Sequence, residues 1–269
     1  MMAENDVFRV EKEDNIAWLI LNRPQKRNSM NVAFFEGLLK NFSAFDGDPD
    51  VRVVIIRAEG KSFTAGIDLT EMASMLQGEG VRFRQELKKN ILKLQDTMSA
   101  IEKCRKPVIA AVHSHCIGGG VDLLSACDIR MASRDAIFSI RETRIAIIAD
   151  LGTLQRLPHI IGEGRFRELA LTGRDFSAQE ALEMGFITRL CEDRESLYSE
   201  ARELAEQIAG NSPITVQGVK EVINFSRDNG VYAGLEYVAQ KNACLLPSED
   251  LMEAFRAFVE KRKPQFKGK

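Results

Sequence analysis

Residues 107–128 read PVIAAVHSHCIGGGVDLLSACD, and three consecutive glycines divide this stretch in two. The apolar run at 107–114 predicts a buried strand, and the spacing after the glycines predicts a helix over 118–128. Free N–H groups at a helix start favour negative charge, and without side chains they can touch a substrate oxygen. The spacing is not the GxGxxG of a dinucleotide site. Tight packing of the helix is the alternative interpretation.

The same alternation of strands and helices continues on both sides of this stretch. Strand patterns are found at 7–22 (a hairpin), 51–59, 107–114 and 128–140. Helical patterns are found at 31–48, 83–104, 118–128 and 151–162, and the chain is mostly helical from residue 163. We therefore predict an α/β fold, with a core over residues 1–200 and a helical C-terminal region over 201–269.

The composition is that of a soluble globular protein with a sizeable core. Of 269 residues, 45% are hydrophobic and 28% are charged, and the formal net charge is -2. This balance gives no general attraction to nucleic acid or to a membrane surface, so neither is expected as a partner. No apolar run approaches the roughly 20 residues that span a bilayer.

The cysteines and the two termini lead us to expect a cytoplasmic location. The five cysteines are odd in number and form no CxxC pair, which predicts reduced thiols. The N-terminal stretch MMAENDVFRVEKEDN has neither a secretory nor a transit pattern. The C-terminal FKGK is not the peroxisomal SKL signal.

A second loop, KSFTAGIDLTEM at 61–72, follows a predicted buried strand. Its small residues Ala65 and Gly66 allow a sharp turn and a close approach to a ligand. The backbone N–H of Ile67 could then point into a cleft. An ordinary turn between a strand and a helix is the alternative.

The sequence HSHC at 113–116 does not predict a metal site. His113 and His115 alternate, so on a strand they would share a face. Two histidines without a CxxC or HExxH pattern do not complete a set of ligands. Cys116 has no evident base beside it, so we expect no nucleophilic role for it.

Three acids remain to be explained. Asp122 lies in the first turn of the predicted helix, where an acid stabilises the helix in any case. Glu142 and Asp150 flank the apolar run IAIIA at 145–149, although a buried carboxylate is costly unless it is paired, hydrogen-bonded or protonated. Asp150 could cap a helix over 151–162, and Glu142 could be exposed at a strand end. The pattern alone leaves these possibilities open.

Five motifs in a fixed order resemble the crotonase, or enoyl-CoA hydratase/isomerase, superfamily over nearly the whole chain. The motifs are LNRPQKRNSMN, KSFTAGIDL, KPVIAAVHSHCIGGGVDLLSACDIR, TLQRLPHIIG and LTGRDFSAQEALEMGFI, followed by AFVEKRKPQF. The resemblance implies a spiral of ββα units, with C-terminal helices that build trimers or hexamers. It implies an acyl-CoA thioester as the substrate and no separate cofactor or metal.

The resemblance also implies site residues. An oxyanion hole for the thioester oxygen maps to the N–H groups of Ile67 and Gly119. The substrate-binding loop maps to Ala65, Gly66, Ile67, Asp68 and Leu69. Lys26 and Arg27 lie where the basic stretch after NRP would meet coenzyme A.

Within the superfamily, Asp122, Glu142 and Asp150 resemble the three acids of the Δ3,5-Δ2,4-dienoyl-CoA isomerases. The resemblance implies that Glu142 takes the C2 proton, that Asp150 serves C6 and that Asp122 tunes the pair. Such isomerases have EVDVGLAAD where this chain has ETRIAIIAD, so Arg144 replaces an acid, Ala146 a glycine and Ile148 an alanine.

Two other functions remain possible at this point. A 2-enoyl-CoA hydratase would need two carboxylates to hold a water and would give Asp150 no task. A non-catalytic acyl-CoA- or RNA-binding relative would use the basic tail EKRKPQFKGK at 260–269. Whichever function is correct, the segment 232–246 indicates an oligomer, because it has more apolar side chains than the surface of a monomer would expose.

Overall fold

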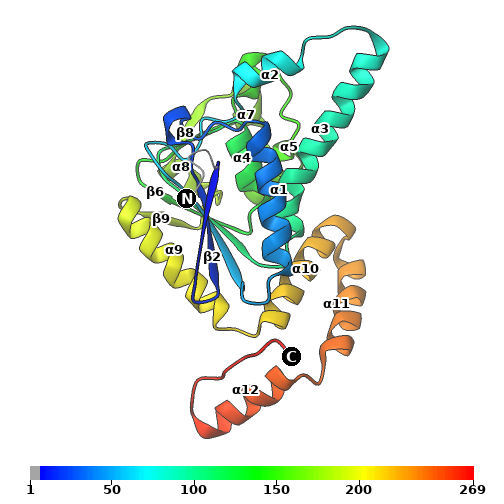
Figure 1. Cartoon of the computed structure of the whole chain (residues 1–269). Helices are drawn as coiled ribbons and strands as arrows, with labels where there is room; N and C mark the ends of the chain where they lie inside the picture. The colour runs from blue at the N-terminus through cyan, green and yellow to red at the C-terminus, as the bar shows by residue number, and fades with distance from the viewer. Residues whose placement is uncertain (1–6) are drawn as a thin grey trace, which may run out of the picture.

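The computed structural model describes residues 7–269, and its centre is a six-stranded sheet (Figure 1). The strands follow the order β1 (Phe8–Glu13), β2 (Ile16–Leu21), β3 (Val53–Ala58), β4 (Val108–Val112), β6 (Ile129–Ser133) and β9 (Arg189–Cys191). β1 and β2 form the predicted antiparallel hairpin, and the later neighbours are parallel. β3 and β4 are central and nearly all buried, which explains their unbroken apolar sequences.

A second sheet of three short strands lies beside the first. It contains β5 (His115–Ile117), β7 (Ile137–Ser139) and β8 (Asp175–Ser177). The chain passes from β4 to β5 and from β6 to β7 through short turns, so it winds repeatedly from one sheet to the other. α4 (Gly119–Ala126) follows β5 directly. The predicted ββα spiral is confirmed.

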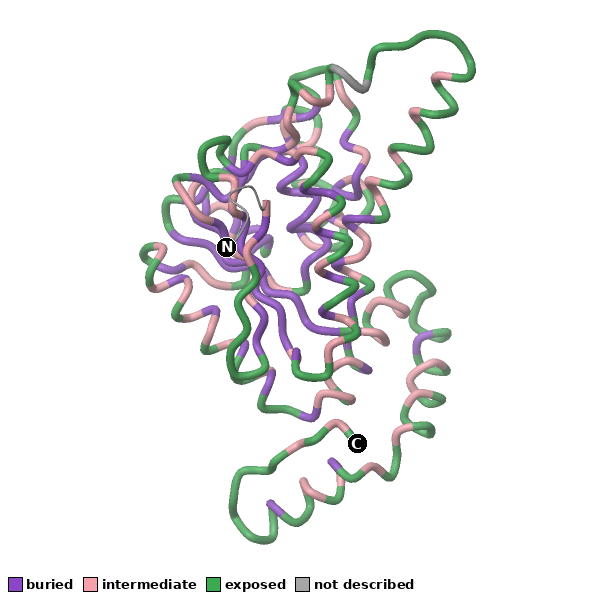
Figure 2. The backbone as a smooth tube through the Cα atoms, viewed as in Figure 1, coloured by how far each residue is buried: buried purple, intermediate pink, exposed green. Residues whose placement is uncertain are grey.

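Helices cover both faces of the main sheet. On one face, α1 (Val32–Gly47), α3 (Gly80–Lys103) and α4 enclose the larger apolar core together with the second sheet. On the other face, α9 (Arg194–Ala209) packs its buried leucine and alanines against β3, β4 and β6. Figure 2 shows the buried backbone concentrated between these layers.

The C-terminal helices form an arm that extends away from this core (Figure 1). The arm consists of α10 (Pro213–Asn229), α11 (Val231–Leu245) and α12 (Glu249–Glu260). The predicted helical C-terminal region is therefore present. Its boundary differs from residue 201, because α9 crosses that position and belongs to the core. No helix in the described part of the chain is long and apolar enough to cross a membrane.

The shortest elements depart from the sequence prediction. β5, β8 and β9 have three residues each, which is too few to show an alternating pattern. α2 (Leu69–Met75) was not predicted as a separate helix. The single helix expected over 151–162 is two, α5 (Thr153–Arg156) and α6 (Pro158–Ile161), with Pro158 at the start of the second. The remaining short elements are η1 (Pro24–Lys26), η2 (Glu142–Ile145), α7 (Glu163–Thr172) and α8 (Ala178–Glu183).

One buried side chain, that of Asn28, ties together the two loops that follow β2 and β3. Its Nδ2 donates to the carbonyls of Glu59 and Ser62 at 2.8 and 2.9 Å, and its Oδ1 accepts the N–H of Arg23 at 2.8 Å. Asn28 is 1% exposed and has a left-handed φ of 53°, a conformation that Asn tolerates better than most residues. These loops carry the basic pair Lys26 and Arg27 and the predicted substrate-binding segment at 65–68.

We expect Asn28→Ala to lower the free energy of unfolding by about 3 kcal/mol, because three backbone groups, one buried and two partly buried, lose their partner. Asn15→Ala is the matched control, since Asn15 also has a left-handed φ (65°) but makes one exposed hydrogen bond, to the carbonyl of Asp50. Its expected loss is about 1 kcal/mol or less. Urea denaturation at one fixed protein concentration measures both. Equal losses would contradict the proposed importance of the buried contacts.

Candidate active site

Two loops bring their backbones into direct contact beneath the start of α4. Gly66 has a φ of +86°, and a Cβ at this position would lie 2.7 Å from the carbonyl oxygen of Ile117. Met30 pairs with the loop from the other side, because its N–H donates to Gly66 O at 2.8 Å and its carbonyl accepts from Asp68 at 2.9 Å. Only glycine fits at position 66, since any side chain would collide with the neighbouring backbone.

This contact brings the backbone at Gly66 and Ile67 next to the start of α4. The Met30 pairing uses the groups on either side of Ile67, so the N–H of Ile67 points away from that pairing. Gly119 is the first residue of α4, where the N–H has no partner within the helix. The Cβ position of Gly66 is 3.7 Å from Gly119 N. Neither N–H donates to any described residue, so both are available to one small acceptor.

Asp122 is the most deeply buried of the three acids, with 1% of its surface exposed. It lies on α4 one turn after the glycines, and its Oδ1 accepts the N–H of Thr153 at 2.7 Å. Burial, together with the charges of Glu142 and Asp150, raises the pKa of Asp122 to about 7, although the hydrogen bonding of Thr153 lowers it. The carboxylate therefore joins α4 to α5 in addition to any effect on its own helix.

Glu142 is buried against the glycine loop rather than exposed at a strand end. It begins η2 directly after β7, and its Oε1 lies 3.1 Å from the point where a Cβ on Gly118 would be. Its Oε2 is buried and has no hydrogen-bond partner among the described residues. Burial and then the charge of Asp150 raise the pKa of Glu142. This carboxyl group therefore lies beside Gly118, directly before α4, with one buried oxygen that has no partner among residues 7–269.

Asp150 is partly buried and does not cap a helix. The N-cap of α5 is Gly152, which has no side-chain hydrogen bond to the helix, so the capping alternative is wrong. The backbone carbonyl of Asp150 accepts from Gln95 Nε2 at 2.6 Å, and burial raises the pKa of its carboxyl group. The charge of Asp150 acts on both Asp122 and Glu142, so the three acids form one electrostatic cluster.

The remaining residues of the substrate loop lie at the edge of this cluster. Ala65 and Leu69 are exposed. The carboxylate of Asp68 is already occupied, because it accepts from Arg23 at 3.0 Å, from Ser29 and from the N–H of Thr70. Asp68 therefore fixes the loop shape and caps α2.

The basic pair lies beside this loop. The carbonyl of Arg27 accepts the N–H of Ala65 at 2.9 Å, which joins the two segments. The side chains of Lys26 and Arg27 are exposed, and within residues 7–269 neither forms an ion pair. They are free to meet an anionic group that approaches the loop.

The histidines and Cys116 do not assemble a reactive centre. The chain turns at Ser114, which has a φ of 52°, so His113 and His115 do not share a strand face as expected. His113 is buried against Gly60 O and the hydroxyl of Tyr198, whereas His115 is exposed. Burial raises the pKa of the Cys116 thiol well above its usual range. The described residues contain no cluster of three potential metal ligands.

Three residues that hold the acids were not singled out from the sequence. Thr153 and Arg156 belong to the motif TLQRLPHIIG, which we noted without assigning roles. Gln95 lies in the polar part of the α3 sequence, where no pattern distinguishes it from its neighbours. Only the contacts between distant segments reveal them.

The chain is similar to known proteins in both sequence and fold. The family model for enoyl-CoA hydratase/isomerase matches residues 11–269. The chain is 44% identical over 266 residues to the peroxisomal Delta(3,5)-Delta(2,4)-dienoyl-CoA isomerase of Arabidopsis thaliana, covering 97% of this chain and 96% of that protein. It is also 44% identical to the mitochondrial Delta(3,5)-Delta(2,4)-dienoyl-CoA isomerase of Dictyostelium discoideum, covering 97% and 91%. The crystal structure of an enoyl-CoA hydratase from Bacillus anthracis superposes with a TM-score of 0.91 at 35% identity, covering 98% of this chain and 100% of that one.

The cytoplasmic location expected from the termini and thiols is wrong by these comparisons. The similar isomerases are peroxisomal and mitochondrial proteins. Reduced thiols exclude an oxidising compartment but do not distinguish the cytoplasm from other reducing ones.

The raised pKa of Asp122 predicts a pH-dependent stability with a defined sign. Its ordinary pKa is 3.8 and its folded pKa is about 7, so the folded state binds the proton more tightly than the unfolded state. The corresponding stability is complete below the ordinary pKa and is lost as the pH rises through the folded value. Asp122→Asn keeps the acceptor for Thr153 and removes the charge. We expect its melting temperature, relative to wild type, to rise between about pH 4 and pH 8. A difference that is independent of pH would contradict this prediction.

Proposed function

The chain belongs to the enoyl-CoA hydratase/isomerase family, and we propose that it moves the double bonds of a 3,5-dienoyl-CoA to the 2,4 positions in fatty acid degradation. The observation that carries the proposal is the third acid. Asp150 lies in one electrostatic cluster with Asp122 and Glu142 and has no capping role to explain it.

The thioester oxygen binds to the N–H groups of Ile67 and Gly119. Removal of a C2 proton places negative charge on this oxygen, and preorganised donors count most where charge develops. One such donor is typically worth about 10²–10³ in rate. Gly66 allows the two donors to lie together, and Ala65 and Leu69 flank the bound thioester. Lys26 and Arg27 meet the phosphates of coenzyme A beside the loop.

The acids move two protons at separate carbons. Glu142 takes the C2 proton, and the electron pair of that bond is held as an enolate with its charge on the thioester oxygen. When the carbonyl re-forms, this pair becomes the C2–C3 double bond. The C3–C4 pair shifts to C4–C5, and the C5–C6 pair takes a proton from Asp150 at C6. The product is the 2,4-diene, with Glu142 protonated and Asp150 ionised. A return of the proton from Glu142 to Asp150, directly or through solvent, restores the starting state.

The pKa shifts support this assignment of protons. A proton donor at C6 must be protonated when the reaction starts, and burial raises the pKa of Asp150. Carboxyl groups that share a site cannot all ionise at neutral pH, so they titrate as a coupled set. Asp122, with a pKa of about 7, acts through this coupling to tune the pair. The steps are proton transfers, so coenzyme A enters as part of the substrate and no further cofactor is required.

The two alternative functions explain less. A hydratase is the activity named for the similar Bacillus anthracis structure, but it leaves Asp150 without a task. An RNA-binding relative would use the basic tail, whose backbone is held within the fold. Asp250 accepts the N–H groups of Lys267 and Gly268, and Arg52 donates to Phe266 O at 2.8 Å. These contacts weigh against a free nucleic-acid-binding tail.

Amide variants should separate the two proton transfers. In heavy water, Asp150→Asn should still exchange the C2 proton of a 3,5-dienoyl-CoA but form little 2,4 product. Glu142→Gln should lose both, because nothing starts the reaction. Each acid–base group is typically worth about 10²–10⁴-fold, so mass spectrometry and absorbance will resolve the losses. Wild-type hydration of a 2-enoyl-CoA is assayed alongside. If Asp150→Asn isomerises at the wild-type rate, hydratase becomes the better assignment.

The protein also acts as an oligomer of three-fold symmetry, a trimer or a dimer of trimers. The support is the arm, where Phe258 and Val259 are 85% and 79% exposed and a hollow of about 970 Å³ separates α10, α11 and α12. Such apolar surface is unfavourable in water unless another chain covers it.

Light scattering at micromolar concentration should give a mass that is a multiple of three chains. Phe258→Asp should reduce that mass, because a charge replaces an apolar contact. Leu39→Asp, a control on α1 where Leu39 is 44% exposed, should leave it unchanged. A wild-type monomer would contradict the proposal.

A further inference from the structure

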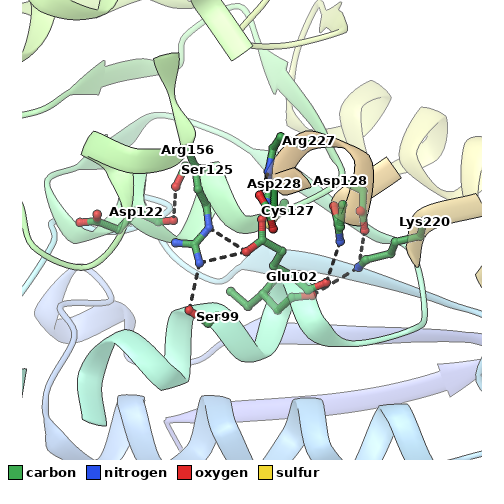
Figure 3. Close-up of polar contacts among 12 residues, drawn as sticks. Ser99, Glu102, Asp122, Ser125, Cys127, Asp128, Arg156, Lys220, Arg227 and Asp228 are labelled. Carbon is green, nitrogen blue, oxygen red and sulfur yellow. Dashed lines mark hydrogen bonds and ion pairs between the residues drawn. The ribbon is translucent and has the colours of Figure 1, made fainter. Parts of the chain in front are cut away.

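A polar network between α3, α5 and α10 is not used by the proposed chemistry, yet it adjoins the acids. Figure 3 shows Glu102 with Arg156 and Arg227 near it, and Arg156 reaching Ser99 as well. The side chains of Arg156 and Glu102 are 12% and 17% exposed. An ion pair that is this shielded from solvent is screened less by salt than a surface pair.

Three residues on one face of α3 contact the segment 150–156. Gln95 donates to Asp150 O at 2.6 Å, and Ser99 and Glu102 accept from Arg156 at 3.0 and 3.1 Å. Their spacing of four and three residues places them along a single helical stripe. α3 therefore forms hydrogen bonds with both ends of the segment that contains Asp150 and Thr153.

Arg156 itself lies against the backbone of that segment. Its Nη1 approaches Leu151 O at 3.4 Å, and a Cβ on Gly152 would lie 1.8 Å from Nη1. Gly152 has a φ of +126°, so the chain bends around the guanidinium at a position that requires glycine. The turn that follows Asp150 is shaped around this side chain.

We propose that Arg156 is a positioning residue, which holds the turn 150–153 on α3 through Ser99 and Glu102 and so aims Asp150 and the Thr153 N–H. The inference rests on the proposed function only for the role of Asp150. The side chain of Asp150 has no hydrogen bond to another described residue that would fix it. Its aim depends on the backbone of the turn. Asp122 depends on the same turn through its bond from Thr153.

Arg156→Gln tests the proposal with two readouts. The amide of Thr153 should exchange with heavy water at least about tenfold faster than in wild type, because its turn opens more often. With 3,5-dienoyl-CoA, the ratio of C2 exchange to 2,4 product should rise at least about threefold, since only the C6 step loses its alignment. A simple loss of folded protein would lower the rate of C2 exchange and the rate of 2,4 product formation together, and it would leave their ratio unchanged. Arg156→Lys should show a partial effect, because one ammonium cannot span both partners.

Arg227→Gln is the matched control. Arg227 pairs with the other oxygen of Glu102 at 2.5 Å and, among residues 7–269, forms no hydrogen bond or ion pair with the turn 150–153. In this variant, the exchange rate of the Thr153 amide and the ratio of C2 exchange to 2,4 product should both stay near the wild-type values. Equal effects in Arg227→Gln and Arg156→Gln would overturn the proposal, because the network would then act through α3 alone.

Ser99→Ala covers the case in which Arg156→Gln does not fold. It removes one partner of Arg156 and should shift both readouts in the same direction by a smaller amount. No change at the Thr153 amide would overturn the proposal. If the wild-type protein fails to isomerise 3,5-dienoyl-CoA, the proposed function is wrong. The amide exchange still decides whether Arg156 positions the turn.

Discussion

The geometry of the candidate site depends on the contact between two backbones at Gly66 and Ile117. No side chain can stand between them, since a Cβ on Gly66 would lie 2.7 Å from the Ile117 carbonyl oxygen. Their separation therefore fixes how far apart the N–H groups of Ile67 and Gly119 can be. Much of the surrounding polar structure serves this contact. Asn28 braces the loop before it, and the N–H of Gly118 donates to Ser139 O at 2.8 Å behind it. The two N–H groups proposed to bind the thioester oxygen are thereby fixed in position by the fold itself, and fixed donors are the ones that best stabilise a developing charge.

Grouping the three acids is unfavourable for the fold, because neighbouring carboxyl groups repel one another and lose hydration. The three acids differ in their burial and in their hydrogen-bond partners. Asp122 is almost fully buried and has the Thr153 N–H as its partner. Glu142 is buried with one oxygen unused, and Asp150 retains partial contact with solvent. Burial is the leading cause of each raised pKa. The cost of grouping the acids is thus expressed as raised pKa values, which favour the protonated form of each carboxyl group.

Much of the fold could be predicted from the sequence because long periodic elements reveal themselves locally. The hairpin, β3, β4 and the amphipathic helices α1 and α3 were found in this way. Three-residue strands such as β8 were not, since their existence depends on partners distant in the chain. The candidate site divides similarly. The glycine loops and the acids were recognisable as motifs, whereas the capping alternative for Asp150 could be rejected only from the observed N-cap, Gly152. The partners Gln95 and Thr153 meet the acids across 55 and 31 residues of sequence, and no local pattern encodes such contacts.

The apolar run between Glu142 and Asp150 is only half buried, and this resolves why acids border it. Ala149 is 5% exposed, but Ile148 is 78% exposed and Ile145 is 44% exposed. The run therefore forms an apolar rim beside the site instead of a core strand. Ala146 bends it with a left-handed φ of 59°, a conformation that costs an alanine about 1 kcal/mol and a glycine nothing. An acyl chain needs an apolar rim, and acid–base groups need restricted water with access to the substrate. A bent, half-exposed segment that ends in a carboxylate meets both requirements at once.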